Sequence, residues 1–227
     1  MIYQKKKILA IIPARLDSKS IKNKNISPYK GKPLIYYSIK TALKSKLIDK
    51  VIVSTDSKKY QKISKNFGAE APFLRPKKFS TDTALDYDYI LHATKFMIKN
   101  NYHPDLVVLL RPTTPNRETD VVDKGIRFFI KVLKSYDSMR SVSEFNQPPQ
   151  KFFMIRNKRL KGFFDKTLSG EYHAYPRQKF AKTYLPNGYV DIFKPKFFLK
   201  NNKLYGKMYP FITADTLDID HKKDLKF

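Results

Sequence analysis

Cationic, hydroxyl and amide side chains are concentrated in one short segment near the N-terminus, directly after an apolar run. They are Arg15, Ser18, Lys19, Lys22, Lys24 and Asn25. Such side chains, together with loop amides, can bind phosphate groups. The segment contains no glycine before Gly31, so it is neither a G-x-G-x-x-G fingerprint nor a Walker P-loop. We therefore predict a phosphate-binding loop that uses side-chain cations, with a solvated basic loop as the alternative.

Two carboxylates lie two positions apart near the C-terminus, where Leu217 and Ile219 alternate with Asp218 and Asp220. This alternation predicts a strand, on which side chains two positions apart share one face. Like charges that close repel each other unless a cation lies between them, and Mg²⁺ prefers such oxygen ligands. Asp218 and Asp220 are therefore candidate magnesium ligands, although an Asp-x-Asp pair is also common by chance.

Two other polar loops follow apolar runs. Asp56 lies in the first, where a helix cap explains it at least as well as a ligand does. Arg111 begins the second, whose sequence over residues 111–117 is Arg-Pro-Thr-Thr-Pro-Asn-Arg. A structural turn explains the prolines of this loop, but a binding site explains the guanidinium at the strand tip better.

The elements that must position these loops alternate along the chain. Apolar runs at residues 8–12, 51–54 and 106–110 predict strands that are buried on both faces. Helices are expected at about residues 33–47, 58–67, 83–97 and 119–133, with caps at Ser57 and at Asp82 or Thr83. This order predicts an α/β fold with a parallel sheet. Ligands bind at the carboxyl ends of such strands, so the three loops should meet there.

The pattern changes after residue 138. Short strands are expected at residues 141–143, 152–155, 189–193 and 211–212, with a hairpin turn at 157–159. We predict a single domain over residues 1–227, with residues 144–182 as a β-rich excursion from the main sheet. The apolar pairs Phe152-Phe153 and Phe163-Phe164 would suit the face of a second subunit, with a hairpin packed within one subunit as the alternative.

Composition excludes several classes of protein. The 227 residues include no cysteine, so disulfides, thiolate catalysis and cysteine metal sites are absent. No apolar run approaches the ~18 residues that cross a bilayer, and no signal-peptide core is present, so we expect a soluble, cytoplasmic protein without membrane insertion. The net charge of +26 would attract polyanions. Because the basic residues are spread along the chain without a nucleic-acid-binding motif, we expect no specific nucleic-acid partner.

Taken in order, the segments resemble the acylneuraminate cytidylyltransferase family, which makes CMP-activated sialic-type sugar acids. The resemblance extends from residue 8 to about residue 224. It is carried by Ile12-Pro13-Ala14-Arg15, Ser18-Lys19, Lys24-Asn25, Gly31-Lys32-Pro33-Leu34, Ser54-Thr55-Asp56, Gly68-Ala69-Glu70, Leu74-Arg75-Pro76, Asp82-Thr83, Arg111-Pro112-Thr113-Thr114-Pro115, Pro176-Arg177-Gln178, Pro186-Asn187-Gly188 and Asp218-Ile219-Asp220.

The resemblance implies a Rossmann-like nucleotidyltransferase fold, with a mostly parallel central sheet flanked by helices and a β-rich dimerisation excursion. It implies transfer of CMP from CTP to the anomeric hydroxyl of a nine-carbon-type 2-keto sugar acid, with Mg²⁺ as the cofactor. The CTP-binding residues would be Ala14, Arg15, Ser18, Lys24, Asn25, Arg75, Asp82 and Thr83. Residues near the sugar acid would be Arg111, Lys151, Arg177 and Asn187, with Lys151 and Arg177 acting across a homodimer interface.

Catalysis would depend on Arg15 and Lys24, which neutralise the phosphates, and on Asp220, which assists deprotonation of the attacking hydroxyl. Asp218 and Asp220 would hold the metal. The chain departs from the sialic acid members at Arg111, where they commonly carry glutamine, and at Leu185, where they carry arginine. The sugar acid therefore stays open, and legionaminic, pseudaminic and N-acetylneuraminic acids are all consistent with the sequence.

Two other readings remain at this stage. One is a nucleotidyltransferase with a different acceptor, such as a Kdo-like acid or a sugar phosphate. The other is a basic nucleic-acid-binding protein without turnover, which would leave Asp218 and Asp220 unexplained.

Overall fold

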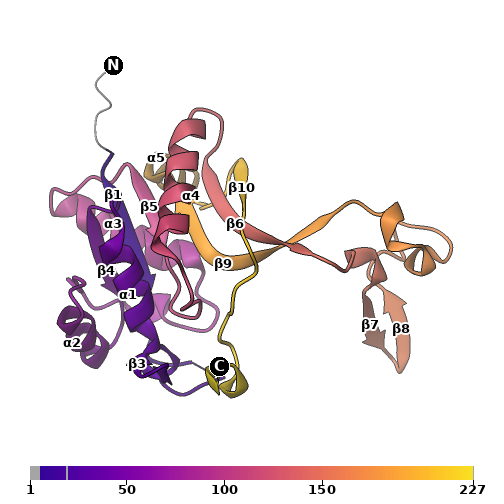
Figure 1. The fold of residues 1–227 in the computed structure, drawn as a ribbon, viewed down its shortest axis with the longest axis horizontal. Helices are drawn as coiled ribbons and strands as arrows, with labels where there is room; N and C mark the ends of the chain where they lie inside the picture. Colours follow the sequence, from indigo (N-terminus) through magenta and orange to yellow (C-terminus); the bar gives the residue numbers. More distant parts are fainter. Residues whose placement is uncertain (1–5, 19, 227) are drawn as a thin grey trace.

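A six-stranded sheet forms the centre of the computed structural model, which describes residues 6–18 and 20–226. The order across it is β10-β6-β9-β5-β1-β4, and within these six strands only β9 runs against the others (Figure 1). The strands are β1 (Ile8–Pro13), β4 (Lys50–Ser54), β5 (Leu106–Leu109), β6 (Ser138–Phe145), β9 (Thr183–Phe193) and β10 (Met208–Ile212). The predicted mostly parallel α/β sheet is confirmed. Lys19 of the predicted phosphate-binding loop lies outside the described residues.

Helices cover both faces of this sheet. Along β1, Ile8, Ala10 and Ile12 pack in one apolar cluster, while Leu9 and Ile11 pack in another on the opposite face. The first face is covered by α1 (Leu34–Lys44), α2 (Lys58–Asn66) and α4 (Thr119–Val132), and the second by α3 (Asp86–Lys99) and α5 (Pro195–Asn201). The continuous apolar runs are therefore strands that are buried on both sides, as predicted.

The helix caps agree with the sequence in one place and differ in another. Ser57 caps α2, because its hydroxyl accepts a hydrogen bond from the Tyr60 amide at 3.3 Å. Neither Asp82 nor Thr83 caps α3, so that prediction is wrong. The helix begins at Asp86, and the Leu85 amide donates instead to the Asp88 carboxylate, 3.0 Å away within the first turn.

The segment that contains Asp218 and Asp220 is not a strand, contrary to the prediction. It lies extended without a strand partner, and the Ile219 amide donates to the Thr113 carbonyl at 2.8 Å. Ile219 is fully buried in a small apolar cluster with Ile21, and both aspartates are exposed. The alternation of apolar and acidic residues thus reflects one buried anchor in an extended segment, rather than pairing in a sheet.

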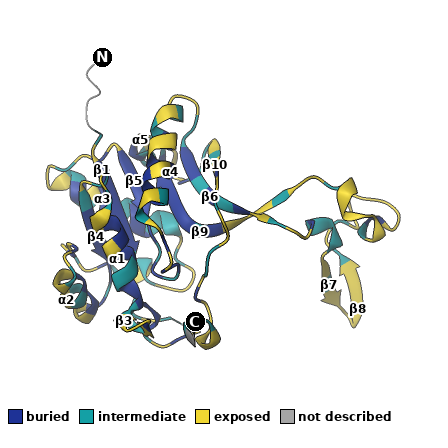
Figure 2. Cartoon of the chain, viewed as in Figure 1, coloured by how far each residue is buried: buried dark blue, intermediate teal, exposed yellow. Residues whose placement is uncertain are grey.

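Residues 144–182 project from the body as an arm (Figure 1). The ends of β6 and β9 pair along its base, and the hairpin of β7 (Phe153–Arg156) and β8 (Arg159–Gly162) lies at its tip. Asn157 and Lys158 make the predicted turn with φ of 49° and 59°. Most of the tip is exposed (Figure 2). A further two-stranded ribbon pairs β2 (Pro28–Tyr29) with β3 (Lys32–Pro33).

Within the described ranges, no helix combines the length and the apolar character needed to cross a membrane.

Candidate active site

A cavity of about 580 Å³ opens at the carboxyl ends of β1 and β5, where ligand binding was predicted. Its walls include eight of the residues that the sequence singled out. These are Arg15, Ser18, Lys24, Asn25, Arg75, Asp82, Arg111 and Asp220. The N-terminal cationic loop and the C-terminal aspartate segment therefore meet around one space.

Lys24 joins these two segments directly. Its ammonium donates to the Asp220 carboxylate at 2.9 Å and to the Ile219 carbonyl at 3.1 Å. The side chain lies in a short 3-10 turn, Lys24–Ile26, and the residue is only 9% exposed. The neighbouring Asn25 amide donates to the Arg15 carbonyl at 2.9 Å, which fixes the loop on which Arg15 stands. The cations of the loop are therefore held in place before any ligand binds.

Arg75 and Arg15 form a second cationic group on the cavity wall. Arg75 donates from Nε to the Ser54 hydroxyl at 3.0 Å, and its guanidinium stacks over the Tyr89 ring at 4.6 Å. Burial lowers the pKa of Arg75 to about 10, so the side chain remains charged at neutral pH. Arg15 forms an ion pair with Asp82. Both guanidiniums therefore bring positive charge to the cavity wall, which attracts an anionic ligand.

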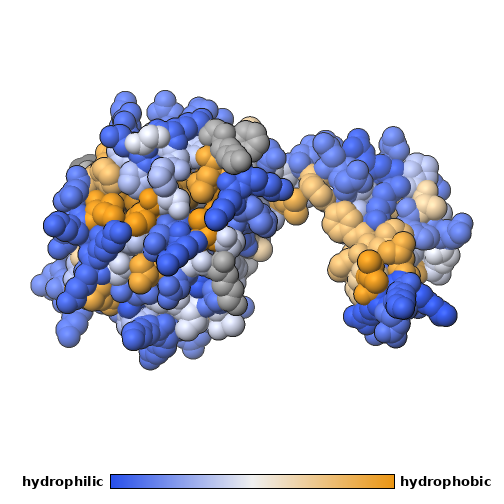
Figure 3. Space-filling view, turned by 90° about the horizontal axis from the view of Figure 1, so that it is seen from below, coloured by the Kyte–Doolittle hydropathy of each residue, from blue (hydrophilic) through white to orange (hydrophobic). Residues whose placement is uncertain are grey.

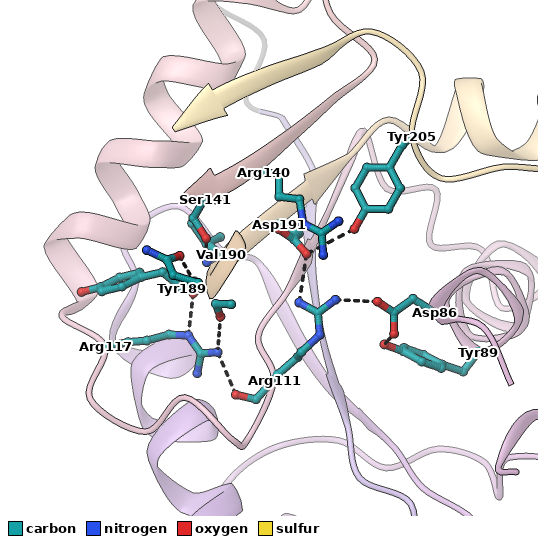
Figure 4. A network of polar contacts seen from close by, with 12 residues as sticks. Asp86, Tyr89, Arg111, Arg117, Arg140, Ser141, Tyr189, Val190, Asp191 and Tyr205 are labelled. Atoms are coloured by element: carbon teal, nitrogen blue, oxygen red, sulfur yellow. Dashed lines mark hydrogen bonds and ion pairs between the residues drawn. The ribbon is translucent and has the colours of Figure 1, made fainter. Parts of the chain in front are cut away.

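Arg111 lies at the end of β5 between two carboxylates (Figure 4). One terminal nitrogen donates to Asp191 on β9 at 2.9 Å, and the other donates to Asp86 at the start of α3. Burial opposes the charge on Arg111, but the attraction of the two aspartates outweighs it and holds the pKa well above its ordinary value. The guanidinium is thus permanently charged and already paired.

Arg117 supports the loop that carries Arg111. It is 8% exposed and donates to five oxygens, which include the carbonyls of Arg111, Gly188 and Tyr189 (Figure 4). Burial, with repulsion from Arg111, lowers the pKa of Arg117 to about 9. Because Arg117 bonds to both the 111–117 loop and β9, it fixes the wall of the cavity from behind.

The remaining predicted site residues do not line the cavity, and their roles stay predictions. Ala14 is buried behind the loop, and Thr83 is next to the lining residue Asp82. Asn187 is buried, and its amide donates to the Thr213 hydroxyl at 2.7 Å, which joins β9 to the segment after β10. Asp218 is exposed outside the cavity. Lys151 and Arg177 lie in the arm, so the chain itself does not bring them to the site.

Sequence analysis missed four residues of the site. They are Asp86, Tyr89, Arg117 as a buried support, and Asp191. The sequence does mark Asp191, because it is the one acid in the apolar run Tyr189–Phe193 and a charge there needs a buried partner. Nothing in the sequence marks Asp86 or Tyr89 as site residues, because their role depends on which loop α3 packs against.

The residues fit a divalent cation only in part. The described residues contain no group of three or more His, Asp or Glu side chains that could hold a metal ion. Mg²⁺, however, usually takes one or two carboxylates and completes its shell with water and substrate phosphates. Asp220 on the cavity wall suits such a shared site, and Asp218 lies two residues away on the exposed side.

A larger groove of about 680 Å³ lies between α4 and residues 209–217. None of the predicted CTP, sugar or metal residues lines it. The cations and Asp220 therefore make the smaller cavity the candidate site.

Comparisons with known proteins show what the chain as a whole is similar to. The sequence model of the family described as Cytidylyltransferase matches residues 9–114. The chain is 34% identical to the N-acylneuraminate cytidylyltransferase of Escherichia coli over 97% of its own length, and it spans about half (51%) of that protein. It is 30% identical to the pseudaminic acid cytidylyltransferase of Campylobacter jejuni, covering 97% of this chain and 94% of that protein.

The fold is also similar to solved structures. A CMP:2-keto-3-deoxy-manno-octonic acid synthetase complexed with CTP superposes with a TM-score of 0.71 at 18% identity, covering 97% of this chain and 95% of that one. A 4-diphosphocytidyl-2C-methyl-D-erythritol synthase from Anaerococcus prevotii gives a TM-score of 0.61 at 12% identity, covering 98% and 96%. At these identities the likeness concerns the fold alone.

Proposed function

The chain belongs to the acylneuraminate cytidylyltransferase family, and from this premise we propose that it transfers CMP from CTP to a sialic-acid-like 2-keto sugar acid. The anomeric hydroxyl oxygen attacks the α-phosphorus of CTP, the bond to the β-phosphate oxygen breaks, and pyrophosphate leaves. The observation that carries the proposal is the contact of Lys24 with Asp220 inside a cavity that Arg15 and Arg75 also line.

The cations of the N-terminal loop bind the triphosphate in this mechanism. Negative charge grows on the phosphate oxygens during nucleotidyl transfer, and fixed cations lower its energy without having to reorganise. Lys24 and Arg15 are already oriented, by Asp220 and Asp82 respectively. CTP would compete with these carboxylates for the same cations. On the adjoining wall, Arg75 is the candidate to face the cytidine.

Asp220 assists the attacking hydroxyl by accepting its proton as the new bond to phosphorus forms. We further propose that Asp220 and Asp218 hold Mg²⁺ together with the triphosphate. A bound divalent cation would neutralise phosphate charge and orient the leaving group. Asp220 supports this part of the proposal, because its carboxylate is on the cavity wall.

We also propose that the protein acts as a homodimer in which the arm contacts the second copy. The arm exposes large apolar side chains, among them Ile155 at 78% and Leu160 at 67% exposure. Figure 3 shows this apolar surface gathered on the arm, apart from the body of the molecule. Contiguous apolar surface of this kind is typical of a protein interface. In such a dimer Lys151 and Arg177 would act at the site of the other subunit.

Pyrophosphate release tests the proposed function. The purified protein is incubated with CTP and, in turn, with N-acetylneuraminic, legionaminic, pseudaminic and Kdo-type acids, with Mg²⁺ or with EDTA. We expect release with at least one nine-carbon acid and none without an acceptor. Release with the Kdo-type acid alone would mean that the acceptor belongs to another class of sugar acid. No release with any acid would overturn the proposal. Unchanged rates in EDTA would show that the reaction does not need a divalent metal ion.

A further inference from the structure

Arg111 is already paired with acids of the protein itself. Its two terminal nitrogens donate to carboxylates from different elements, to Asp191 on β9 at 2.9 Å and to Asp86 at the start of α3 (Figure 4). A guanidinium recognises a carboxylate best through two parallel hydrogen bonds. A substrate carboxylate that approached the two terminal nitrogens would therefore have to compete with Asp86 and Asp191.

Asp191 belongs to a wider neutral cluster. It is 1% exposed, and besides Arg111 it faces the Arg140 guanidinium at 3.8 Å and the Tyr205 hydroxyl at 3.4 Å. Two guanidiniums and the carboxylates of Asp86 and Asp191 sum to no net charge. A buried pair of this kind resists separation, because removing one partner leaves the other charge unpaired in a low-dielectric environment.

Asp86 is the part of this cluster that reaches the ligand space. Its side chain is 36% exposed and lines the cavity beside Tyr89, whose hydroxyl donates to Asp86 at 2.5 Å. Burial alone would raise the pKa of Asp86, but Arg111 and the Tyr89 hydroxyl outweigh it and lower that pKa. The cavity therefore presents an ionised carboxylate here, which accepts hydrogen bonds and repels other carboxylates.

We infer that Asp86, held against Arg111, is a specificity-determining residue that accepts a hydrogen bond from an uncharged donor on the acceptor, a hydroxyl or an acylamino N–H. The carboxylate of the sugar acid then binds away from this wall. The inference rests on the proposed function and makes its substrate class more specific. In this arrangement the role of Arg111 is to position Asp86, and Arg111 does not pair with the substrate.

The variant Asp86→Asn separates this inference from the alternative that Arg111 clamps the acceptor carboxylate. Loss of a charged hydrogen-bond acceptor should raise KM for the acceptor about tenfold or more. KM for CTP should stay within about twofold, because the lost contact is to the acceptor alone. If Arg111 bound the acceptor carboxylate, the same change would free one of its nitrogens and KM would fall.

Asp120→Asn is the matched control. Asp120 is an exposed acid in the first turn of α4, as Asp86 is in the first turn of α3, and it does not line the cavity. Both variants lose a similar favourable interaction with a helix N-terminus. The control should keep the wild-type KM for the acceptor, and it should melt above Asp86→Asn, which also loses the ion pair with Arg111. The acceptor is the acid of the panel that the wild type uses fastest.

A second set of variants keeps the test decisive if a single change disturbs folding. Arg111→Gln leaves Asp86 without its guanidinium, whereas the double variant Asp86→Asn, Arg111→Gln removes one charge of each sign and keeps Asp191 beside Arg140. If Arg111 acts only by positioning Asp86, the double variant should have the same KM for the acceptor as Asp86→Asn. A further rise of this KM in the double variant would mean that the guanidinium itself binds the substrate.

The outcomes distinguish the inference from the proposed function. A wild type that releases no pyrophosphate overturns both. Turnover by the wild type, combined with an acceptor KM that falls or does not change in Asp86→Asn, overturns only the inference. A rise in KM for CTP alone would place Asp86 on the nucleotide side and also overturn it.

Discussion

Lys24 connects the N-terminal cationic loop to the C-terminal aspartate segment, because its ammonium donates to both Asp220 and the Ile219 carbonyl. Replacing it with alanine removes the cation that pairs with Asp220 and two of the hydrogen bonds that hold the C-terminal segment. We expect Lys24→Ala to lower kcat/KM about 10²–10³-fold, the usual cost of losing one preorganised charge-stabilising group. Steady-state pyrophosphate release measures the change.

Lys22 provides the matched control for Lys24. It lies in the same loop, is exposed, and does not line the cavity. Lys22→Ala removes the same charge and chain length from the loop, so it should keep at least about half of the wild-type rate if long-range charge is well screened. Equal losses in the two variants would show that overall loop charge, and not the position of Lys24, supports the rate.

The lowered pKa of Asp86 makes the stability of the folded protein depend on pH in the acid range. Its pKa in the folded protein lies below the ordinary value of 3.8, so the folded state holds this proton less tightly than the unfolded state does. The stability that Asp86 contributes is thus complete above pH 3.8 and is lost as the pH falls through the lower folded pKa.

Urea midpoints measured between pH 6 and pH 2 check this dependence. The wild type should lose more stability over the acid range than Asp86→Asn, which has no carboxyl to protonate at this position. Parallel curves for the two proteins would contradict the ion pair of Asp86 with Arg111.

At the scale of elements, the strands that contain an apolar run were predictable and the first half of β9 was not. β1, β4 and β5 each contain a short run of buried apolar residues, as expected for strands covered on both faces. β9 extends over Thr183–Phe193, but its first half contains Pro186 and the positive-φ Gly188, and its exposed residues carry no apolar pattern. Pairing with β6, not local sequence, makes that half a strand.

The candidate site shows the same division. Residues of the loops after β1 and β5 could be predicted, because the carboxyl ends of parallel strands fix where loops meet. The partners of Arg111 could not, since Asp86 lies 25 residues before it and Asp191 lies 80 residues after it. Such pairs depend on how α3 and β9 pack against the sheet.

A substitution at Arg117 tests what holds the loop between β5 and α4 in place. Lysine at this position would retain the charge but has three donors on one nitrogen, too few to reach five separate oxygens. The carbonyls left without a donor are buried or partly buried, so Arg117→Lys should cost roughly 2–4 kcal/mol of unfolding free energy. Urea denaturation measures the loss.

Arg127 supplies the control for this substitution. It is an exposed residue of α4, and Arg127→Lys should change stability by less than about 0.5 kcal/mol. A wild-type midpoint for Arg117→Lys would show that the loop is held by its prolines and not by the arginine.

At the scale of the whole molecule, contacts within a single chain do not account for the stability of the arm. An isolated two-stranded hairpin is at best marginally stable in water. The hairpin of β7 and β8 nevertheless exposes Ile155 and Leu160, and part of Phe153. Burial of these side chains against a second copy would stabilise the hairpin and the dimer together.

A charge introduced at the tip of the arm tests whether the arm contributes to the dimer. Ile155→Glu places a carboxylate on the proposed interface and should shift the protein from dimer to monomer in sedimentation velocity. Lys158→Glu, in the turn between β7 and β8, adds the same acid beside the hairpin and should leave the dimer intact. A dimer that persists in Ile155→Glu would place the interface elsewhere.

Mixing two inactive variants tests whether the arm completes the site of the other subunit. Lys24→Ala damages the cavity and keeps the arm, whereas Arg177→Ala damages the arm and keeps the cavity. A mixed dimer then holds one site with an intact cavity from one chain and an intact arm from the other. After equal mixing and subunit exchange, half of the dimers are mixed, so about a quarter of wild-type activity should return. If Arg177 acted within its own chain, every site would keep one defect and no activity would return.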